Sequence, residues 1–101
     1  MGMFDWVEVT YPLAREHWGR QWQTKSVPAP ALRKLLITTT GELYYGRKRL
    51  TFDGALTVYD LNDDVTVLFL YTFIFEHGHI VATHYRSEVV GDASNDEVRY
   101  L

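Results

Sequence analysis

The most strongly patterned part of the chain is residues 65–90, where apolar side chains fill two consecutive runs. In residues 65–75 nearly every side chain is β-branched, aromatic or leucine, and these side chains pack well on a pleated surface. Residues 76–78 interrupt the pattern, and Gly78 can adopt a positive φ at little cost. The second run covers residues 79–90. The segment therefore predicts a long antiparallel hairpin.

Alternation with a period of two assigns these side chains to two faces. A three-residue loop of Glu76, His77 and Gly78 would place the odd-numbered positions of both arms on one face, with most aromatic residues. A two-residue turn at His77 and Gly78 would shift the register by one and mix aromatic with charged positions. We expect the three-residue loop, because it separates the two sets better. The first arm is apolar on both faces, which predicts a strand covered on both sides or part of a closed or oligomeric sheet.

Shorter segments of similar composition predict further strands, and turn-forming residues separate them. Residues 13–26 are ambiguous, because they fit either a helical turn near residues 14–18 or a short strand. Residues 27–31 contain two prolines and predict a stiff extended connector, and residues 91–101 a frayed end or a short closing element. The expected strands outside the hairpin are residues 3–11, 21–25, 32–39, 42–49 and 55–61.

About six strands joined by short turns predict an all-β fold with little helix. We expect an antiparallel meander that forms a curled sheet, a small barrel or a sandwich. A chain of 101 residues, 47% of them apolar, corresponds to one domain that can bury a core without cross-links. We therefore expect residues 1–101 to form a single domain.

Charge is divided unevenly along the chain, although the net formal charge is only −3. Residues 15–49 carry eight basic and two acidic side chains, a net charge of +6, whereas residues 50–101 carry two basic and nine acidic ones, a net charge of −7. Attraction between the two halves explains this division. The alternatives are a basic face that meets a phosphate backbone or an acidic protein, and an acidic face that imitates nucleic acid.

The chain contains no cysteine, which excludes disulfides and thiolate metal sites and fits a reducing cytoplasm. The first residues lack a basic segment followed by an apolar run, and no stretch approaches the roughly 20 apolar residues that span a bilayer. We therefore expect a cytoplasmic protein without membrane association.

The chain opens with Met-Gly-Met-Phe-Asp at residues 1–5 and carries an aromatic-Gln-Thr-Lys motif at residues 22–25. Both motifs resemble those of a set of small phage and prophage proteins. Residues 11–13 and 52–59 are also similar in order. The resemblance implies no assigned activity. It implies an accessory phage gene that works inside an infected bacterium, where such genes often encode stoichiometric inhibitors of host defence or modulators of host enzymes.

Aromatic and basic residues are interleaved in two places, residues 18–25 and residues 44–49. Tryptophan, tyrosine and arginine are the usual anchors of protein interfaces, and aromatic platforms with cationic neighbours also stack bases and hold phosphates. The alternative is that the tryptophans cover one side of the sheet as core. The candidate partner-binding residues are Trp18, Arg20, Trp22, Lys25, Tyr45, Arg47 and Arg49.

Other patterns give little support for chemistry. Glu76, His77 and His79 can converge at a loop tip, so a metal-dependent hydrolase is one alternative function. A small molecule or nucleotide in a curled sheet lined by the aromatic residues of segment 69–73 (Phe69, Tyr71 and Phe73) is another. The chain has no nucleophile elbow and no nucleotide-binding glycine pattern. We assign no catalytic residue, no metal ligand and no cofactor.

Taken together, these patterns favour a non-enzymatic, phage-type accessory protein that binds a host or phage protein and blocks its surface. The two apolar faces of residues 65–75 also favour self-association, with a symmetric dimer as the expected form. Nucleic acid is kept as an alternative partner, and it would require affinity that falls steeply with salt.

Overall fold

Eight strands and one short 3-10 helix form the part of the chain that the computed structural model describes, residues 3–28 and 31–90. These described residues contain no α-helix, so the all-β class is confirmed, with eight strands in place of about six. The elements are β1 Asp5–Val9, η1 Arg15–His17, β2 Gln21–Thr24, β3 Lys34–Ile37, β4 Leu43–Tyr45, β5 Lys48–Leu50, β6 Gly54–Leu61, β7 Val67–Glu76 and β8 His79–Val89.

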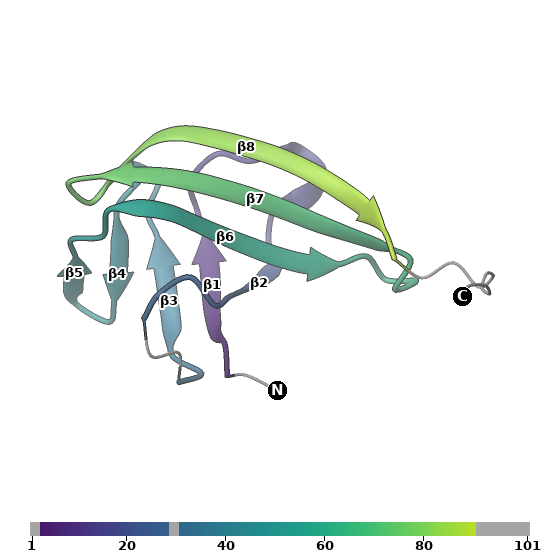
Figure 1. Cartoon of the computed structure of the whole chain (residues 1–101), viewed down its shortest axis with the longest axis horizontal. Helices are drawn as coiled ribbons and strands as arrows, with labels where there is room; N and C mark the ends of the chain where they lie inside the picture. The colour runs from purple at the N-terminus through teal and green to yellow at the C-terminus, as the bar shows by residue number, and fades with distance from the viewer. Residues whose placement is uncertain (1–2, 29–30, 91–101) are drawn as a thin grey trace.

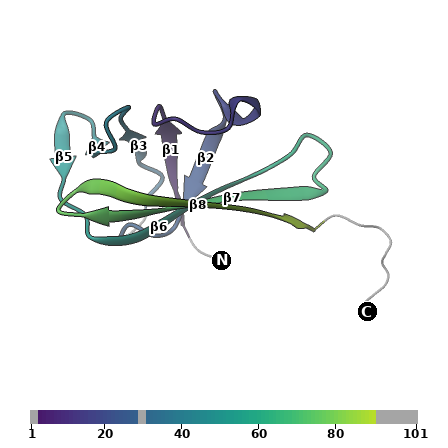
Figure 2. The ribbon, with the colours of Figure 1, turned by 90° about the horizontal axis from the view of Figure 1, so that it is seen from above.

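The strands form one sheet in the order β5-β4-β3-β1-β2-β6-β7-β8. All neighbouring pairs are antiparallel except β1 and β3, which run parallel. Figures 1 and 2 show that the sheet curls, so that the long strands β6, β7 and β8 cross over the shorter strands β1 to β5. The sheet does not close into a barrel, so the curled sheet is the one of the three expected shapes that the chain adopts.

The parallel pair is the main departure from the predicted meander. Strands β2 and β3 lie on opposite sides of β1, so the connection between them has to cross from one side of β1 to the other. The predicted extended connector is in this crossing, and two of its residues, 29–30, lie outside the described residues. Consecutive strands are usually neighbours, and for this reason the sequence pattern favoured a meander.

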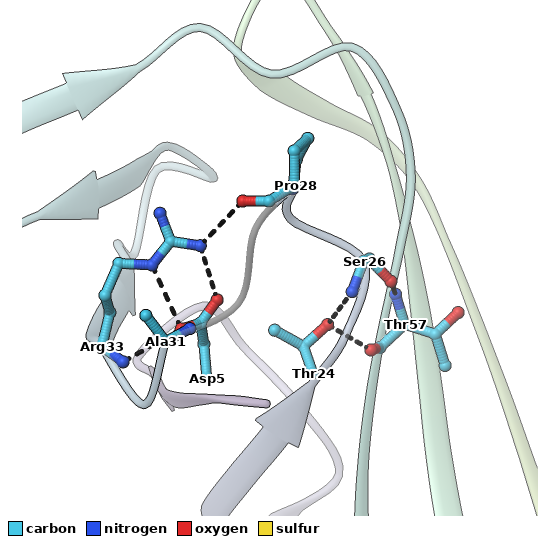
Figure 3. Close-up of polar contacts among 7 residues, drawn as sticks. All are labelled: Asp5, Thr24, Ser26, Pro28, Ala31, Arg33 and Thr57. Carbon is cyan, nitrogen blue, oxygen red and sulfur yellow. Dashed lines mark hydrogen bonds and ion pairs between the residues drawn. The ribbon is translucent and has the colours of Figure 1, made fainter. Parts of the chain in front are cut away.

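A buried carboxylate holds the start of β3 beside the start of β1 (Figure 3). The side chain of Asp5 is fully buried and accepts hydrogen bonds from the backbone N–H groups of Ala31 and Arg33 at 3.0 and 2.9 Å. The Arg33 guanidinium adds two more bonds, Nε to Oδ1 at 3.1 Å and Nη2 to Oδ2 at 2.8 Å. Burial alone would raise the pKa of the Asp5 carboxyl, but the hydrogen bonds from Arg33 and Ala31 outweigh burial and lower it. Asp5 is therefore an ionised anchor for the crossing connection.

The β7–β8 hairpin turns over two residues, His77 and Gly78, so the predicted three-residue loop is wrong. Their φ values of 52° and 79° are those of a type I′ turn, whose twist matches that of the flanking strands. A register shift next to Phe75 then adds one residue to β8, and Tyr71 lies opposite Tyr85. This bulge restores the pairing of odd with odd positions that the three-residue loop was expected to produce.

The odd-numbered side chains of β7 form the centre of the core. Tyr71, Phe73 and Phe75 are each at most 4% exposed, and the curl of the sheet packs them against β1 to β4 and β6. The even-numbered side chains from Leu68 to Ile74 lie on the outer face and are only half-buried. Within the described residues, β7 is therefore covered fully on one face.

The turn between β3 and β4 meets the start of β8 and draws two parts of the curled sheet together. The Ile80 N–H donates to the Gly41 carbonyl at 2.9 Å, and Glu42 and His79 form an isolated antiparallel bridge. We call these four residues the closing contact. Gly41 has a φ of 84°, and a Cβ there would lie 3.2 Å from the Ile80 Cβ and 3.3 Å from the Tyr11 ring. The contact therefore depends on a glycine at this position.

Candidate functional site

A groove of about 530 Å³ runs along the outer face of β1. Val7 of β1 and Leu35 of β3 face the core, so the neighbouring even-numbered side chains face outward. Lys34 pairs with Trp6 at one end of the groove. The groove is lined by Trp6, Val7, Glu8, Val9, Thr10, Gly19, Arg20, Gln21, Lys34, Leu35, Leu36 and Gly46.

The first predicted aromatic and basic group borders the end of the groove near Gly19. Trp18 is 65% exposed, and its indole N–H donates to the Leu13 carbonyl at 3.0 Å, which fixes the ring. The Arg15 guanidinium lies 5.8 Å from the centre of this ring. A second hollow, of about 310 Å³, lies against Trp18 and shares the lining residues Val9, Thr10 and Gly19 with the groove.

Arg20 also lines this end, and its guanidinium is held from two sides. Its Nη1 donates to Asp60 Oδ2 at 2.9 Å, and the group lies 4.8 Å from the centre of the Phe69 ring. Its Nε is buried and forms no hydrogen bond with the described residues. The Arg20 guanidinium is therefore directed toward β6 and β7, where Asp60 balances its charge, and not toward the outer face of β1.

The second predicted group borders the opposite end. Gly46 lines the groove in the turn between β4 and β5, and it stands between Tyr45 and Arg47. Tyr45 is 47% exposed, but it pairs with core-facing Leu35, so its side chain lies on the face of the sheet opposite the groove, with the Arg33 guanidinium 5.9 Å from its ring centre. Arg47 and its neighbour Lys48 are exposed. The structure thus brings the two segments to opposite ends of the groove through Gly19 and Gly46, whereas the Tyr45 side chain lies on the other face of the sheet.

Trp22 does not belong to this surface. It is 1% exposed and lies edge-on to Tyr71, with ring centres 5.5 Å apart. The prediction of Trp22 as a partner contact is wrong, because the inward-facing position in β2 is a core position. The alternative, that tryptophan covers one side of the sheet, holds for this residue.

Two further predicted contacts lie away from the groove. Arg49 lies against the closing contact, where its Nη2 is 3.1 Å from His79 Nδ1 and its Nε 3.9 Å from a Glu42 carboxylate oxygen. Lys25 is exposed just beyond the end of β2 and is not among the residues that line the groove. The structure therefore separates both residues from Trp18 and Arg20.

The sequence analysis missed Trp6, Lys34 and Leu36 as groove residues. The available signal was the alternation in β1, where Trp6 shares a face with Glu8 and opposes two valines. A large aromatic residue on the polar face of a strand indicates a surface where a partner can pack. Lys34 and Leu36 carried no comparable signal, because their place beside β1 depends on the parallel pairing of β3.

A buried histidine lies under the hairpin, outside the groove. His17 is 3% exposed, and its Nδ1 lies 2.7 Å from the Tyr71 hydroxyl. Burial lowers the pKa of His17, although the nearby Glu16 carboxylate acts in the opposite direction. The ring packs at 4.6 Å from Phe69 and 5.2 Å from Tyr85, between ring centres. His17 is therefore a core residue whose neutral form is favoured by burial.

The structure gives no support to the two alternative sites, the metal site near His79 and the small-molecule site along β7. His79 lies 2.9 Å from Glu42 through its Nε2, and the described residues hold no group of three side chains suited to a metal ion, Glu76 and His77 included. Tyr71 and Phe73 are packed in the core, so the odd-numbered face of β7 is filled by side chains where a small-molecule cavity was considered.

No protein-family model, curated protein or solved structure matches this chain significantly. In residues 3–28 and 31–90, no helix has the length and apolar character that crossing a bilayer requires. The functional argument therefore rests on the groove and its surroundings.

Proposed function

We propose that this chain is a non-enzymatic binding protein whose groove along β1 holds an extended segment of another protein. The observation that carries the proposal is the position of the two segments around Gly19 and Gly46, which are distant in sequence but border opposite ends of the groove. The volume of about 530 Å³ lies within the roughly 300–1,000 Å³ that is usual for binding clefts.

The charges around the groove favour an acidic segment. Arg15 lies beside Trp18 near one end, and Lys34 and Arg47 lie near the other, whereas Glu8 is the acidic residue of the lining. Complementary charge would speed association and orient the partner. Exposed Trp18 and half-buried Trp6 would supply the apolar anchors that dominate interface energies.

The resemblance of residues 1–5 and 22–25 to small phage proteins supports a setting inside an infected bacterium. In that setting, a protein that covers part of a host enzyme or defence component inhibits it in proportion to its amount. No bond is made or broken in such a mechanism, so affinity and abundance alone decide its effect.

Capture from a bacterial lysate tests the proposal through matched variants. The double variant Trp18→Ala/Lys34→Glu removes an anchor at one end and reverses a charge at the other. We expect it to retain at least tenfold less of the partner than the wild type, which corresponds to about 1.4 kcal/mol. Lys25→Glu is the control, because it reverses the charge of an exposed lysine outside the groove.

A photo-crosslinking amino acid at Leu36, in the groove, is expected to label the same partner. The same amino acid at Thr72, on the outer face of β7, is expected to leave it unlabelled. Equal capture by the wild type and the double variant, or labelling from Thr72 alone, would move the contact surface away from the groove.

A further inference from the structure

The two edges of the sheet are protected to very different degrees. Strand β5 forms one edge and has three residues, two of them basic. Strand β8 forms the other edge and has 11 residues, none of them proline or glycine. Short, basic edges resist pairing with another chain, whereas long edges without proline invite it. The closing contact covers only the start of β8, at His79 and Ile80.

Backbone bonds show which groups of β8 face the open edge. The Val90 N–H donates to the Thr66 carbonyl at 2.9 Å, so Val90 bonds toward β7. In an antiparallel pair, successive residues alternate between bonding toward the neighbouring strand and pointing away from it. The register with β7 is constant from residue 82 to residue 89. The N–H and C=O groups of the odd-numbered residues in 83–89 therefore point outward.

Apolar side chains accompany these open backbone groups. Val81, Tyr85, Val89 and Val90 are 55%, 47%, 75% and 50% exposed. Figures 1 and 2 show that the end of β8 extends past β1 and β2, so the shorter strands do not cover it. This part of β8 is accessible along its edge.

We propose that the occupant of this edge is a second copy of the chain, paired antiparallel across a two-fold axis at Ser87. The axis makes a continuous 16-stranded sheet from two eight-stranded ones. Residues with outward-pointing backbone groups then face each other, as hydrogen bonding requires. The self-association expected from the apolar faces of residues 65–75 is thereby assigned to a different strand.

The side chains fit this register. Arg86 lies opposite Glu88 of the second copy, and by symmetry this pair occurs twice. Both residues are exposed, and within one chain they already contact each other along the strand. Tyr85 lies opposite Val89 of the second copy, an aromatic and β-branched pair that also occurs twice. Opposite charges and aromatic–β-branched pairs are the cross-strand combinations that stabilise antiparallel sheets.

Neighbouring registers fit less well. An axis at Arg86 would place two arginines directly opposite each other, which destabilises a sheet. An axis at Tyr85 would pair a longer part of the strand, but it would place Arg86 opposite His84 and leave Glu88 opposite an alanine. Among these three registers, the axis at Ser87 is the one that places both Arg86 and Glu88 opposite a residue of opposite charge.

Charge reversal tests the register directly by analytical ultracentrifugation. The single variant Arg86→Glu places two like negative pairs across the axis, and Glu88→Arg places two like positive pairs. We expect each variant alone to dimerise at least tenfold more weakly than the wild type. Mixing the two variants restores opposite charges at both pairs, so a mixed dimer is expected. The double variant Arg86→Glu/Glu88→Arg is expected to dimerise like the wild type.

The reversed side chains are exposed, so folding is expected to be unchanged, and far-ultraviolet circular dichroism checks it. A wild-type protein that stays monomeric from roughly 1 μM to 1 mM would overturn the proposal and leave the edge to a strand from another protein. Dimers that are indifferent to the single reversals would place the contact on another surface. Weakened variants that mixing does not restore would exclude the axis at Ser87.

Discussion

Asp5 joins segments that are far apart in the chain, and the structure gives it no access to solvent. Its carboxylate satisfies two backbone N–H groups and one guanidinium, which together set the parallel register of β1 and β3. A buried charge is costly unless it is paired and hydrogen-bonded, as this one is. The residue that permits the parallel pair is thus a polar one.

Replacing this charge should weaken the fold. Asp5→Asn keeps the shape of the side chain but turns one acceptor into a donor that faces the Arg33 guanidinium. We expect the free energy of unfolding to fall by about 3 kcal/mol, measured by urea denaturation at pH 7. Asp63→Asn, in an exposed turn, is the control and should change it by less than about 0.5 kcal/mol.

The difference in unfolding free energy between the wild type and Asp5→Asn should depend on pH, and its sign follows from the pKa of Asp5. The folded pKa of Asp5 is lowered, so its contribution is complete above its unfolded pKa of about 3.9 and is lost as pH falls through the folded pKa. The gap between the wild type and Asp5→Asn should therefore narrow below about pH 4. A gap of the same size at pH 3 and pH 7 would mean that the charge contributes nothing.

His17 predicts a second pH effect at higher pH. Its folded pKa is lowered, so below the unfolded value of about 6.5 the unfolded chain binds a proton that the folded chain does not. Stability should be complete above about pH 6.5 and fall below it by up to about 1.4 kcal/mol per pH unit. His17→Gln should flatten this dependence, and His84→Gln, at an exposed position, should leave it unchanged.

At the scale of single elements, the β7–β8 hairpin explains how a wrong turn can still produce the right faces. The composition of residues 67–76 identified the strand, and the separation of aromatic from charged positions identified the faces. Turn length and bulge compensate for each other, because each shifts the register by one residue. Alternation along a strand reports faces, but it does not report where an extra residue is accommodated.

The turn between β3 and β4 carries a prediction of its own. Gly41→Ala must accept both a φ of 84° and a Cβ within 3.3 Å of two side chains, whereas Gly46→Ala meets a φ of 62° in open space. We expect about 1 kcal/mol of destabilisation at Gly46 and a further 1–2 kcal/mol or so at Gly41. Thermal unfolding of both variants measures the difference. Equal losses would show that crowding at the closing contact is absent.

At the scale of the whole molecule, the sequence predicted the all-β class but not which distant strands pair with each other. Strand composition and turn residues are local signals, and they identified the regions of β1, β2, β3, β4, β6, β7 and β8. The parallel pairing of β1 with β3 brings Lys34 beside Trp6, and no local pattern reports that contact. The groove was therefore only half predictable: the residues at its ends stood out by composition, whereas those of its floor are defined by tertiary pairing.

Amide hydrogen exchange along β8 tests this global arrangement. The Ile80 N–H points away from β7 but is bonded to Gly41, so it should exchange slowly. The Thr83 N–H also points outward but lies beyond the closing contact, so it should exchange fast at concentrations where the chain is monomeric. Rapid exchange at both positions would show that the two parts of the sheet are apart in solution.

Within residues 3–28 and 31–90, backbone bonds join the distant parts of the curled sheet beside the β7–β8 turn, and this has a mechanical consequence. A closed β-barrel has a fixed radius and no free strand edge, whereas an open sheet without bonds between its ends can flatten. This sheet is intermediate between the two. Its curl is held firmly beside the β7–β8 turn, and it can widen at the far end of β8.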